Sequence, residues 1–122
     1  MKVLKTSLVD CLILQPDVFQ DSRGFFMETY RSNQFALHAG IPDNFLQDNH
    51  SHSSKGVFRG LHFQKNNPQG KLVRASRGTV LDVVVDLRIE SKTFGKSEVF
   101  EISDKNFYQI WVPPGFAHGF LV

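Results

Sequence analysis

Turn signals recur along this chain at short intervals, and they limit the length of any helix or strand between them. They are clusters of Pro, Gly, Asp and Asn at 16–17, 21–24, 42–44, 66–70, 77–78, 94–95 and 113–115. The segments between these turns are rich in Val, Ile, Leu and Phe. Many short strands at such spacing are typical of a β-sandwich or barrel. We therefore expect an all-β fold, an antiparallel jelly roll, formed by one domain over residues 1–122.

One helix and one long strand stand out from this pattern. The sequence predicts a short helix over 32–39, with Ser32 as N-cap and Gly40 directly after its end. Residues 79–87 alternate strictly, which predicts a strand with Val80, Asp82, Val84 and Asp86 on one face. Because that face carries two carboxylates, it is either the solvated outer face of a sheet or the lining of a wet ligand cavity.

Composition and charge exclude several classes of function. Fourteen basic residues against twelve acidic ones, with no basic run, give no support to nucleic-acid or membrane-surface binding. No apolar run approaches the length of a membrane span, and no signal peptide opens the chain. Cys11 is the only cysteine, which excludes a disulfide framework and a cysteine-based zinc site. We expect a cytoplasmic protein without nucleic-acid or membrane partners.

Three residues are candidates for chemistry, each with a structural alternative. His62 lies in an apolar segment, 57–64, where it is either a general base or a histidine satisfied within the core. Lys71 opens another strand-like segment and is either a functional ammonium or a strand-edge lysine. His118 lies among the small residues of 115–119, which let a ligand or a backbone approach closely, and is otherwise a structural turn histidine.

Two arginines and a histidine pair raise the questions of phosphate and metal binding. Arg23 and Arg59 would suit a diphosphate if they converged on one pocket, because a guanidinium binds phosphate oxygens in a bidentate manner. The alternative for each is a surface charge. His50 and His52 are spaced as metal ligands, but no glutamate follows at a suitable distance. We therefore expect two solvated loop histidines and no metal.

Six strings of this sequence, in order and together, resemble the dTDP-4-dehydrorhamnose 3,5-epimerase family. They cover nearly the whole chain, and their combination is more specific than any one of them. The strings are VFQDSRGFFME (18–28), QDNHS (47–51), RGLHFQ (59–64), GKLVR (70–74), DVVVDLR (82–88) and PPGFAHGF (113–120).

The resemblance implies a fold, a reaction and a set of roles. The fold is a cupin-like jelly roll (double-stranded β-helix), usually a homodimer. The reaction inverts C3 and C5 of dTDP-4-dehydro-6-deoxy-D-glucose in dTDP-L-rhamnose synthesis, without metal or organic cofactor. The family's histidine at the position of His62 is the base, and its lysine at Lys71 stabilises the enolate oxygen. The positions that contact the dTDP-sugar match Arg23, Glu28, Gln47, Asp48, Asn49, Arg59 and His118.

Two features of the chain differ from what this family pattern requires. Arg59 and His62 have opposite strand parity, so placing both at one site requires a bulge or twist at Gly60. The family's tyrosine acid and the aspartate that pairs with the base lie beyond Val122, so we expect the C-terminal part of the family domain to be absent. Asp82 is then the carboxylate best placed by the sequence to orient His62.

The alternatives to the 3,5-epimerase reading belong to three classes. The first is a related enzyme that inverts only C3 or only C5 of a deoxyketosugar. The second is a protein that binds sugar nucleotides without turnover, because the acid tyrosine lies outside this chain. The third is a metal-binding cupin with ligands among His50, His52, His62 and His118.

Overall fold

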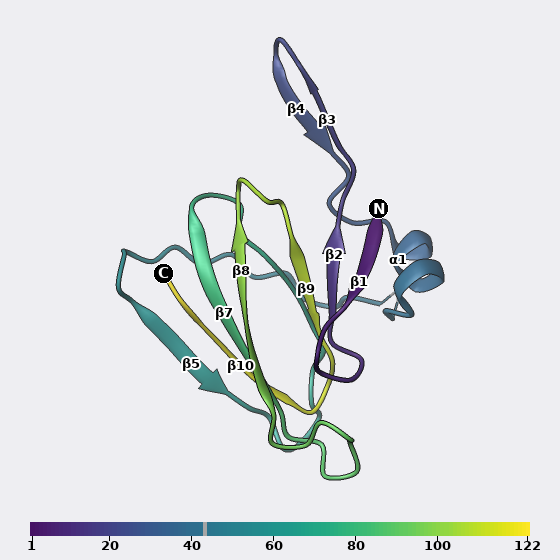
Figure 1. The fold of residues 1–122 in the computed structure, drawn as a ribbon, viewed down its shortest axis with the longest axis vertical. Coiled ribbons are helices and arrows are strands. Elements are labelled where there is room, and N and C mark those ends of the chain that lie inside the picture. The colour runs from purple at the N-terminus through teal and green to yellow at the C-terminus, as the bar shows by residue number, and fades with distance from the viewer. Residues whose placement is uncertain (43) are drawn as a thin grey trace.

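Two four-stranded antiparallel sheets and a separate hairpin contain all strands of the computed structural model, which describes residues 1–42 and 44–122 (Figure 1). The first sheet has the order β1 (Lys2–Lys5), β2 (Leu12–Gln15), β9 (Gln109–Val112), β6 (Lys71–Arg74). The second has the order β5 (Phe58–His62), β10 (Phe116–Leu121), β7 (Thr79–Asp86), β8 (Ser97–Ser103). The hairpin consists of β3 (Val18–Asp21) and β4 (Gly24–Met27). The predicted all-β, antiparallel jelly roll is confirmed.

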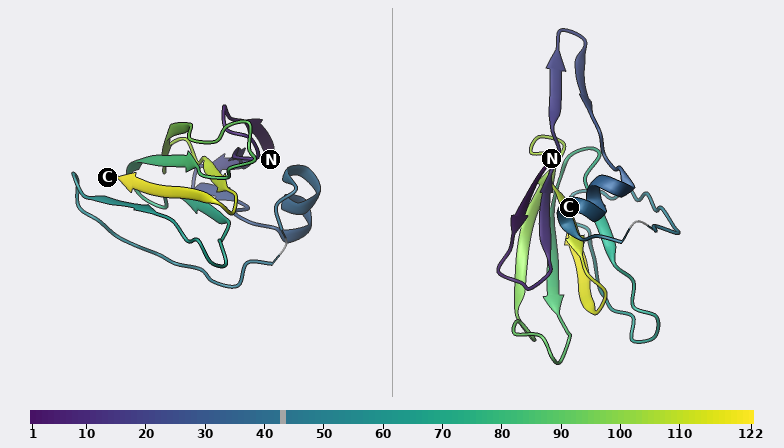
Figure 2. Two further views of the ribbon diagram at one scale, coloured as in Figure 1. Left: turned by 90° about the horizontal axis from the view of Figure 1, so that it is seen from below. Right: turned by 90° about the vertical axis from the view of Figure 1, so that its right-hand side faces the viewer.

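The two sheets pack face to face around one apolar core (Figure 2). Val84, Phe100 and Phe116 enter this core from the second sheet, and Ile110 and Val112 enter it from the first. This core fills the space under β7 and β8. The edge strand β5 is exposed along its whole length, so the sandwich is open on that side.

The predicted helix is confirmed as α1 (Ser32–Ala39), which packs on the outer face of the first sheet through Phe35 and Trp111. Gly40 ends it with a φ of 64°, as predicted. The N-cap is Arg31 rather than Ser32, because the Arg31 carbonyl already accepts from the backbone N–H groups of Gln34 and Phe35. Within the described residues, no helix is long and apolar enough to cross a membrane.

The alternation predicted for the long strand is confirmed in β7, and it places Asp82, Val84 and Asp86 on the inner face. All three side chains are fully buried. The interpretation of this face as the solvated outer surface is therefore wrong. The two carboxylates have different surroundings, and only Asp82 lies beside a candidate functional residue.

Asp86 forms the centre of a clamp at the end of β7. Its carboxylate accepts hydrogen bonds from Arg88 Nε (2.9 Å), Ser91 Oγ (2.6 Å) and Thr93 Oγ1 (2.6 Å). Arg88 also pairs with Asp10 at 2.8 Å, and its guanidinium lies 4.6 Å from the ring centroid of Phe116. The clamp thus joins the loop before β2, the β7–β8 loop and the first residue of β10.

The clamp also fixes the charge of Asp86. Burial raises the pKa of this carboxyl group, but the hydrogen bonds from Arg88, Ser91 and Thr93 outweigh burial and hold the pKa well below its usual range. A carboxyl group whose pKa is lower in the folded state stabilises the fold above its unfolded pKa of about 3.9. That contribution is lost as the pH falls below this value.

We predict that Asp86→Asn lowers the free energy of unfolding at pH 7 by about 3 kcal/mol, because the variant leaves the Arg88 guanidinium without its buried partner. The difference from the wild type should shrink between pH 5 and pH 2, where the wild-type carboxylate becomes protonated. Urea denaturation followed by Trp111 fluorescence measures both values. A difference that stays constant down to pH 2 would contradict the role given to this carboxylate.

Candidate active site

An open pocket of about 490 Å³ lies between β5 and β6, which are edge strands of opposite sheets. His62 is the last residue of β5, and Lys71 is the first residue of β6. The pocket brings these two predicted catalytic residues together, with an imidazole and an ammonium group lining one space. The full lining is Leu61, His62, Phe63, Gln64, Gln69 and Lys71.

A bulge in β5 determines which side chains lie on the same face of the strand as His62. His62 pairs with His118 on β10, and Arg59 pairs with Phe120, so three steps along β5 match two steps along β10. His118 and Phe120 share one face of β10, and Arg59 and His62 therefore share the same face. The predicted bulge at Gly60 is confirmed by this register shift.

The bulge depends on two glycines that face each other. Gly60 has a φ of 122°, a conformation that side chains rarely adopt. A Cβ atom on Gly60 would lie 2.7 Å from the Cα of Gly119, and a Cβ on Gly119 would lie 2.7 Å from the carbonyl oxygen of Arg59. The close approach of β5 and β10 at this point is therefore available only to glycine on both strands.

His118 is buried and paired with a carboxylate. Its Nε2 lies 2.8 Å from Oδ2 of Asp82, and the two residues are 8% and 0% exposed. Burial raises the pKa of Asp82, while the hydrogen bond and the charge of His118 act in the opposite direction without cancelling it. The side chain of this histidine thus presents only one ring nitrogen, Nδ1, to further partners.

The assignment of Asp82 to His62 is wrong, because its hydrogen-bond partner is His118. The order of the sheet explains the difference: β10 lies between β7 and β5, so the strand next to Asp82 carries His118. The sequence contained part of this signal, since Asp82 shares with Val80 and Val84 the face of β7 that is buried in the structure. The pairing of β7 with β10, which brings Asp82 to His118, cannot be seen in the sequence.

Arg59 forms hydrogen bonds that link β5 to the loop that carries three more predicted site residues. Its Nε donates to Ser53 Oγ at 2.9 Å, and its Nη2 donates to the carbonyl oxygen of His52 at 3.2 Å. Gln47 and Asn49 lie exposed in the same loop and bond each other, Nε2 to Oδ1, at 2.9 Å. Asp48 lies between them and is also exposed. The structure thus links this loop to the strand that holds His62.

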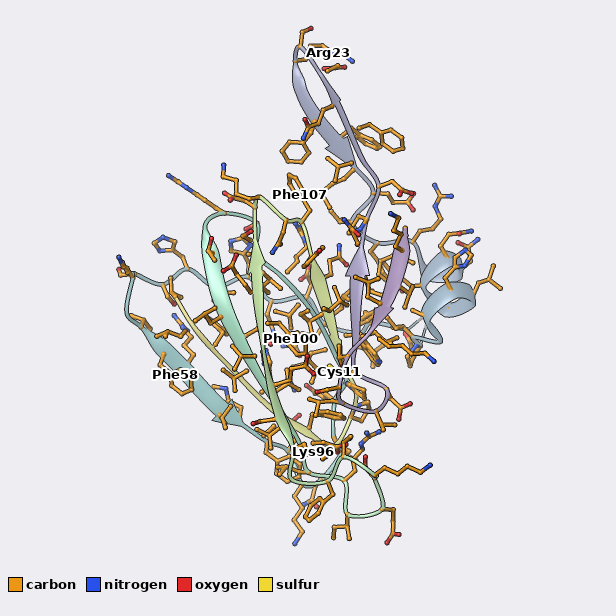
Figure 3. All side chains as sticks on the ribbon, in the orientation of Figure 1. Cys11, Arg23, Phe58, Lys96, Phe100 and Phe107 are labelled. Atoms are coloured by element: carbon orange, nitrogen blue, oxygen red, sulfur yellow. The ribbon has the colours of Figure 1, made fainter. Side chains whose placement is uncertain are left out.

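Arg23 and Glu28 lie apart from this group. Both belong to the projecting hairpin region, where Arg23 pairs with Asp21 at 2.6 Å and Glu28 pairs with Arg31. Figure 3 shows Arg23 at the tip of the hairpin, away from the two sheets. Within a single chain Arg23 and Arg59 do not converge on one pocket, because β3 and β4 pair only with each other.

His50 and His52 lie exposed in the loop before β5. Among the described residues, no group of three or more His, Cys, Asp and Glu side chains is arranged to hold a metal ion. The ionisable groups that line the pocket are the imidazole of His62 and the ammonium group of Lys71, and the Arg59 guanidinium lies on the same face of β5 as His62.

The fold and the pocket define a class: a cupin-like jelly roll with a pocket at the open side of its sandwich. The family model described as dTDP-4-dehydrorhamnose 3,5-epimerase matches residues 5–122. The chain belongs to this family.

Three relatives illustrate the match. Proteins named dTDP-4-dehydrorhamnose 3,5-epimerase from Neisseria gonorrhoeae and Salmonella typhimurium are 54% and 53% identical to this chain, over 100% and 99% of its length. A crystal structure of an epimerase from Legionella pneumophila, described as a complex with dTDP-4-keto-L-rhamnose, superposes with a TM-score of 0.95. It is 45% identical over 99% of this chain.

The chain is shorter than these relatives. It spans 37% of the Neisseria protein, 67% of the Salmonella protein and 64% of the Legionella chain. The family match therefore concerns the jelly-roll portion described above.

Proposed function

We propose that this chain is an isomerase that inverts C3 and C5 of dTDP-4-dehydro-6-deoxy-D-glucose to give dTDP-4-dehydro-L-rhamnose, in dTDP-L-rhamnose biosynthesis. The observation that carries the proposal is the pocket that His62 and Lys71 line from opposite sheets. A base and a cation on facing walls are what proton removal beside a ketone requires. The family membership of residues 5–122 supports the same reaction.

The chemistry begins with His62. C3 and C5 both neighbour the C4 ketone, so their protons are acidic, and a neutral imidazole removes one of them. The electrons move to the C4 oxygen as an enolate, whose negative charge the Lys71 ammonium stabilises. Return of a proton to the opposite face of the same carbon inverts it. Each of these steps is a proton transfer, so the reaction needs no metal or organic cofactor.

Arg59, Gln47, Asp48, Asn49 and His118 are proposed to bind the dTDP-sugar. Arg59 shares the inner face with His62 and holds the loop of Gln47 to Asn49, which supports a common site for the sugar and its diphosphate. His118 lies directly opposite His62 across the two strands.

A homodimer would give Arg23 and Glu28 a role in binding. The β3–β4 hairpin pairs with no other strand and exposes Phe19, Phe25 and Phe26 at 64%, 58% and 70%. A lone hairpin is marginally stable in water, and exposed aromatic side chains mark interaction surfaces. We propose that the hairpin packs on a second copy and presents Arg23 to the diphosphate bound there, in a protein of the cytoplasm.

Deuterium exchange tests the reaction. The 122-residue chain is incubated with dTDP-4-dehydro-6-deoxy-D-glucose in D₂O, and NMR follows deuterium at C3 and C5 separately. We expect exchange that falls by at least about 100-fold in His62→Ala, because the base is lost, and by about 100-fold in Lys71→Met, because the enolate loses its cation. His38→Ala and Lys65→Met, on α1 and in the loop before β6, serve as matched controls with wild-type rates.

Each outcome of this experiment has a defined meaning. Exchange at one carbon only assigns the chain to the single-site epimerases. No exchange in the wild type, with the sugar nucleotide still bound, makes the chain a binding protein and contradicts the proposed reaction. Exchange that survives in His62→Ala contradicts the role of His62.

The dimer has its own test. Light scattering should give twice the mass of the chain for the wild type and a smaller mass for the double substitution Phe25→Ser, Phe26→Ser, because the hairpin loses its apolar contacts. Leu37→Ser, an exposed apolar residue on α1, is the control and should leave the mass unchanged. A monomeric wild type at micromolar concentration would contradict the proposed interface.

A further inference from the structure

The Asp82–His118 pair is the most deeply buried polar group next to the pocket. The Oδ2 of Asp82 lies 2.8 Å from Nε2 of His118, and the Asp82 side chain is fully buried. Its second oxygen, Oδ1, is inaccessible to solvent, and no donor from the described part of the chain reaches it. A carboxylate in such surroundings keeps its negative charge at a high free-energy cost, because one hydrogen bond replaces its full hydration.

The pair lies on the same face as the base. His118 pairs directly with His62 across β10 and β5, and Asp82 pairs with Phe120, two residues further along β10. Directly opposed residues of neighbouring strands have Cβ atoms about 5 Å apart. Because Nε2 of His118 is bonded to Asp82, the nitrogen free to contact a ligand beside His62 is Nδ1.

The elements around the pair carry other titratable groups. His62 and Arg59 come from β5, Lys71 from the facing β6, Glu98 from β8 and Cys11 from the loop before β2. Arg59 is exposed and bonded to its loop, and Glu98 accepts from Ser7. Burial raises the pKa of the Cys11 thiol to about 12, so this group stays neutral.

Two protonation states of the pair have different consequences for Nδ1. With ionised Asp82 and neutral His118, the buried pair has a net charge of −1, and Nδ1 is a bare acceptor. With one more proton the pair is neutral overall. That proton is held either as an imidazolium beside a carboxylate or as a carboxylic acid that donates to Nε2, and in both arrangements Nδ1 carries a hydrogen. The inaccessible Oδ1 and the buried carboxylate favour the neutral pair.

We propose that the buried Asp82–His118 pair holds this additional proton at neutral pH, so that His118 presents Nδ1–H as a hydrogen-bond donor beside His62. Asp82 acts through His118 and is a positioning residue. The Nδ1–H of His118 would donate to a sugar oxygen next to the carbon that His62 deprotonates, either the enolate oxygen or a hydroxyl oxygen. This contact with the sugar rests on the proposed function. The protonation state itself is a property of the free protein.

Nitrogen NMR of the histidine side chains tests the protonation state without substrate. Protein labelled with ¹⁵N-histidine is recorded at pH 7, and His118→Gln assigns the signal. If that variant does not fold, single substitutions of His38, His50, His52 and His62 assign His118 by elimination. We expect the Nδ1 signal of a protonated nitrogen. The signal of an unprotonated Nδ1 at pH 7 would overturn the proposal.

A pair of aspartate variants tests whether Asp82 is the cause. In Asp82→Leu the side chain neither donates to Nε2 nor holds the additional proton. We therefore expect the Nδ1 signal of His118 at pH 7 to move from the protonated position toward that of a neutral imidazole that exchanges between its two tautomers. Asp86→Asn changes an equally buried carboxylate on the same face of β7 and should leave the Nδ1 proton in place. A fully protonated Nδ1 in Asp82→Leu, or loss of the Nδ1 proton in Asp86→Asn, would overturn the role of Asp82.

The same variants separate this proposal from the proposed reaction. In the deuterium assay, Asp82→Leu should lower the exchange rate at saturating substrate at least about tenfold with a smaller change in KM, while Asp86→Asn keeps the wild-type rate. An unchanged rate in Asp82→Leu would overturn the contact of His118 with the reacting sugar. If the wild type shows no exchange, the proposed reaction fails, and the NMR result still decides the protonation of the pair.

Discussion

The contact between Gly60 and Gly119 is the constraint on which the candidate site depends. At this point β5 contains one residue more than β10, and the backbones approach so closely that a Cβ on either glycine would collide with the other strand. The extra residue turns Arg59 to the same face as His62. Without the bulge, strict alternation would leave Arg59 and His62 on opposite faces of β5.

The rest of the sandwich holds β10 in place for this contact. At the start of β10, Phe116 packs in the core and under the guanidinium of Arg88, which Asp86 fixes from the end of β7. Two residues further along β10, His118 is bonded to Asp82 of the same neighbouring strand. The inner face of the second sheet therefore carries the apolar core side chains of β7, β8 and β10 together with the buried Asp82–His118 pair, which lies toward the open side at β5. One sheet therefore contributes side chains both to the core and to the pocket.

Local patterns in the sequence were sufficient for the features that neighbouring residues determine. The helix over 32–39, its end at Gly40 and the strict alternation of β7 follow from side-chain periodicity and from the left-handed conformation of glycine. The bulge at Gly60 was predicted by combining strand parity with the family resemblance, which implies that Arg59 and His62 share one site. Only the N-cap residue was wrong: it is Arg31, which makes no side-chain capping hydrogen bond, and not Ser32.

Pairing between distant segments explains what the sequence could not predict. Asp82 was assigned to His62, because nothing in the sequence places β10 between β7 and β5. The sequence also left open whether Arg23 and Arg59 converge on one pocket. Within one chain they do not, because the hairpin of Arg23 pairs only with itself and projects from the sheets (Figure 1). Both points depend on strand order, which the hydrophobic pattern of each strand leaves undetermined.

The register of β5 on β10 is the central claim, and nuclear Overhauser effects between side chains test it most directly. The account predicts two sets of cross-peaks in the labelled protein, one between His62 and His118 and one between Arg59 and Phe120. Both sets arise together only if one residue of β5 is accommodated as a bulge. Cross-peaks between His62 and His118 without those between Arg59 and Phe120 would show a regular ladder with Arg59 on the outer face, and would contradict the site described here.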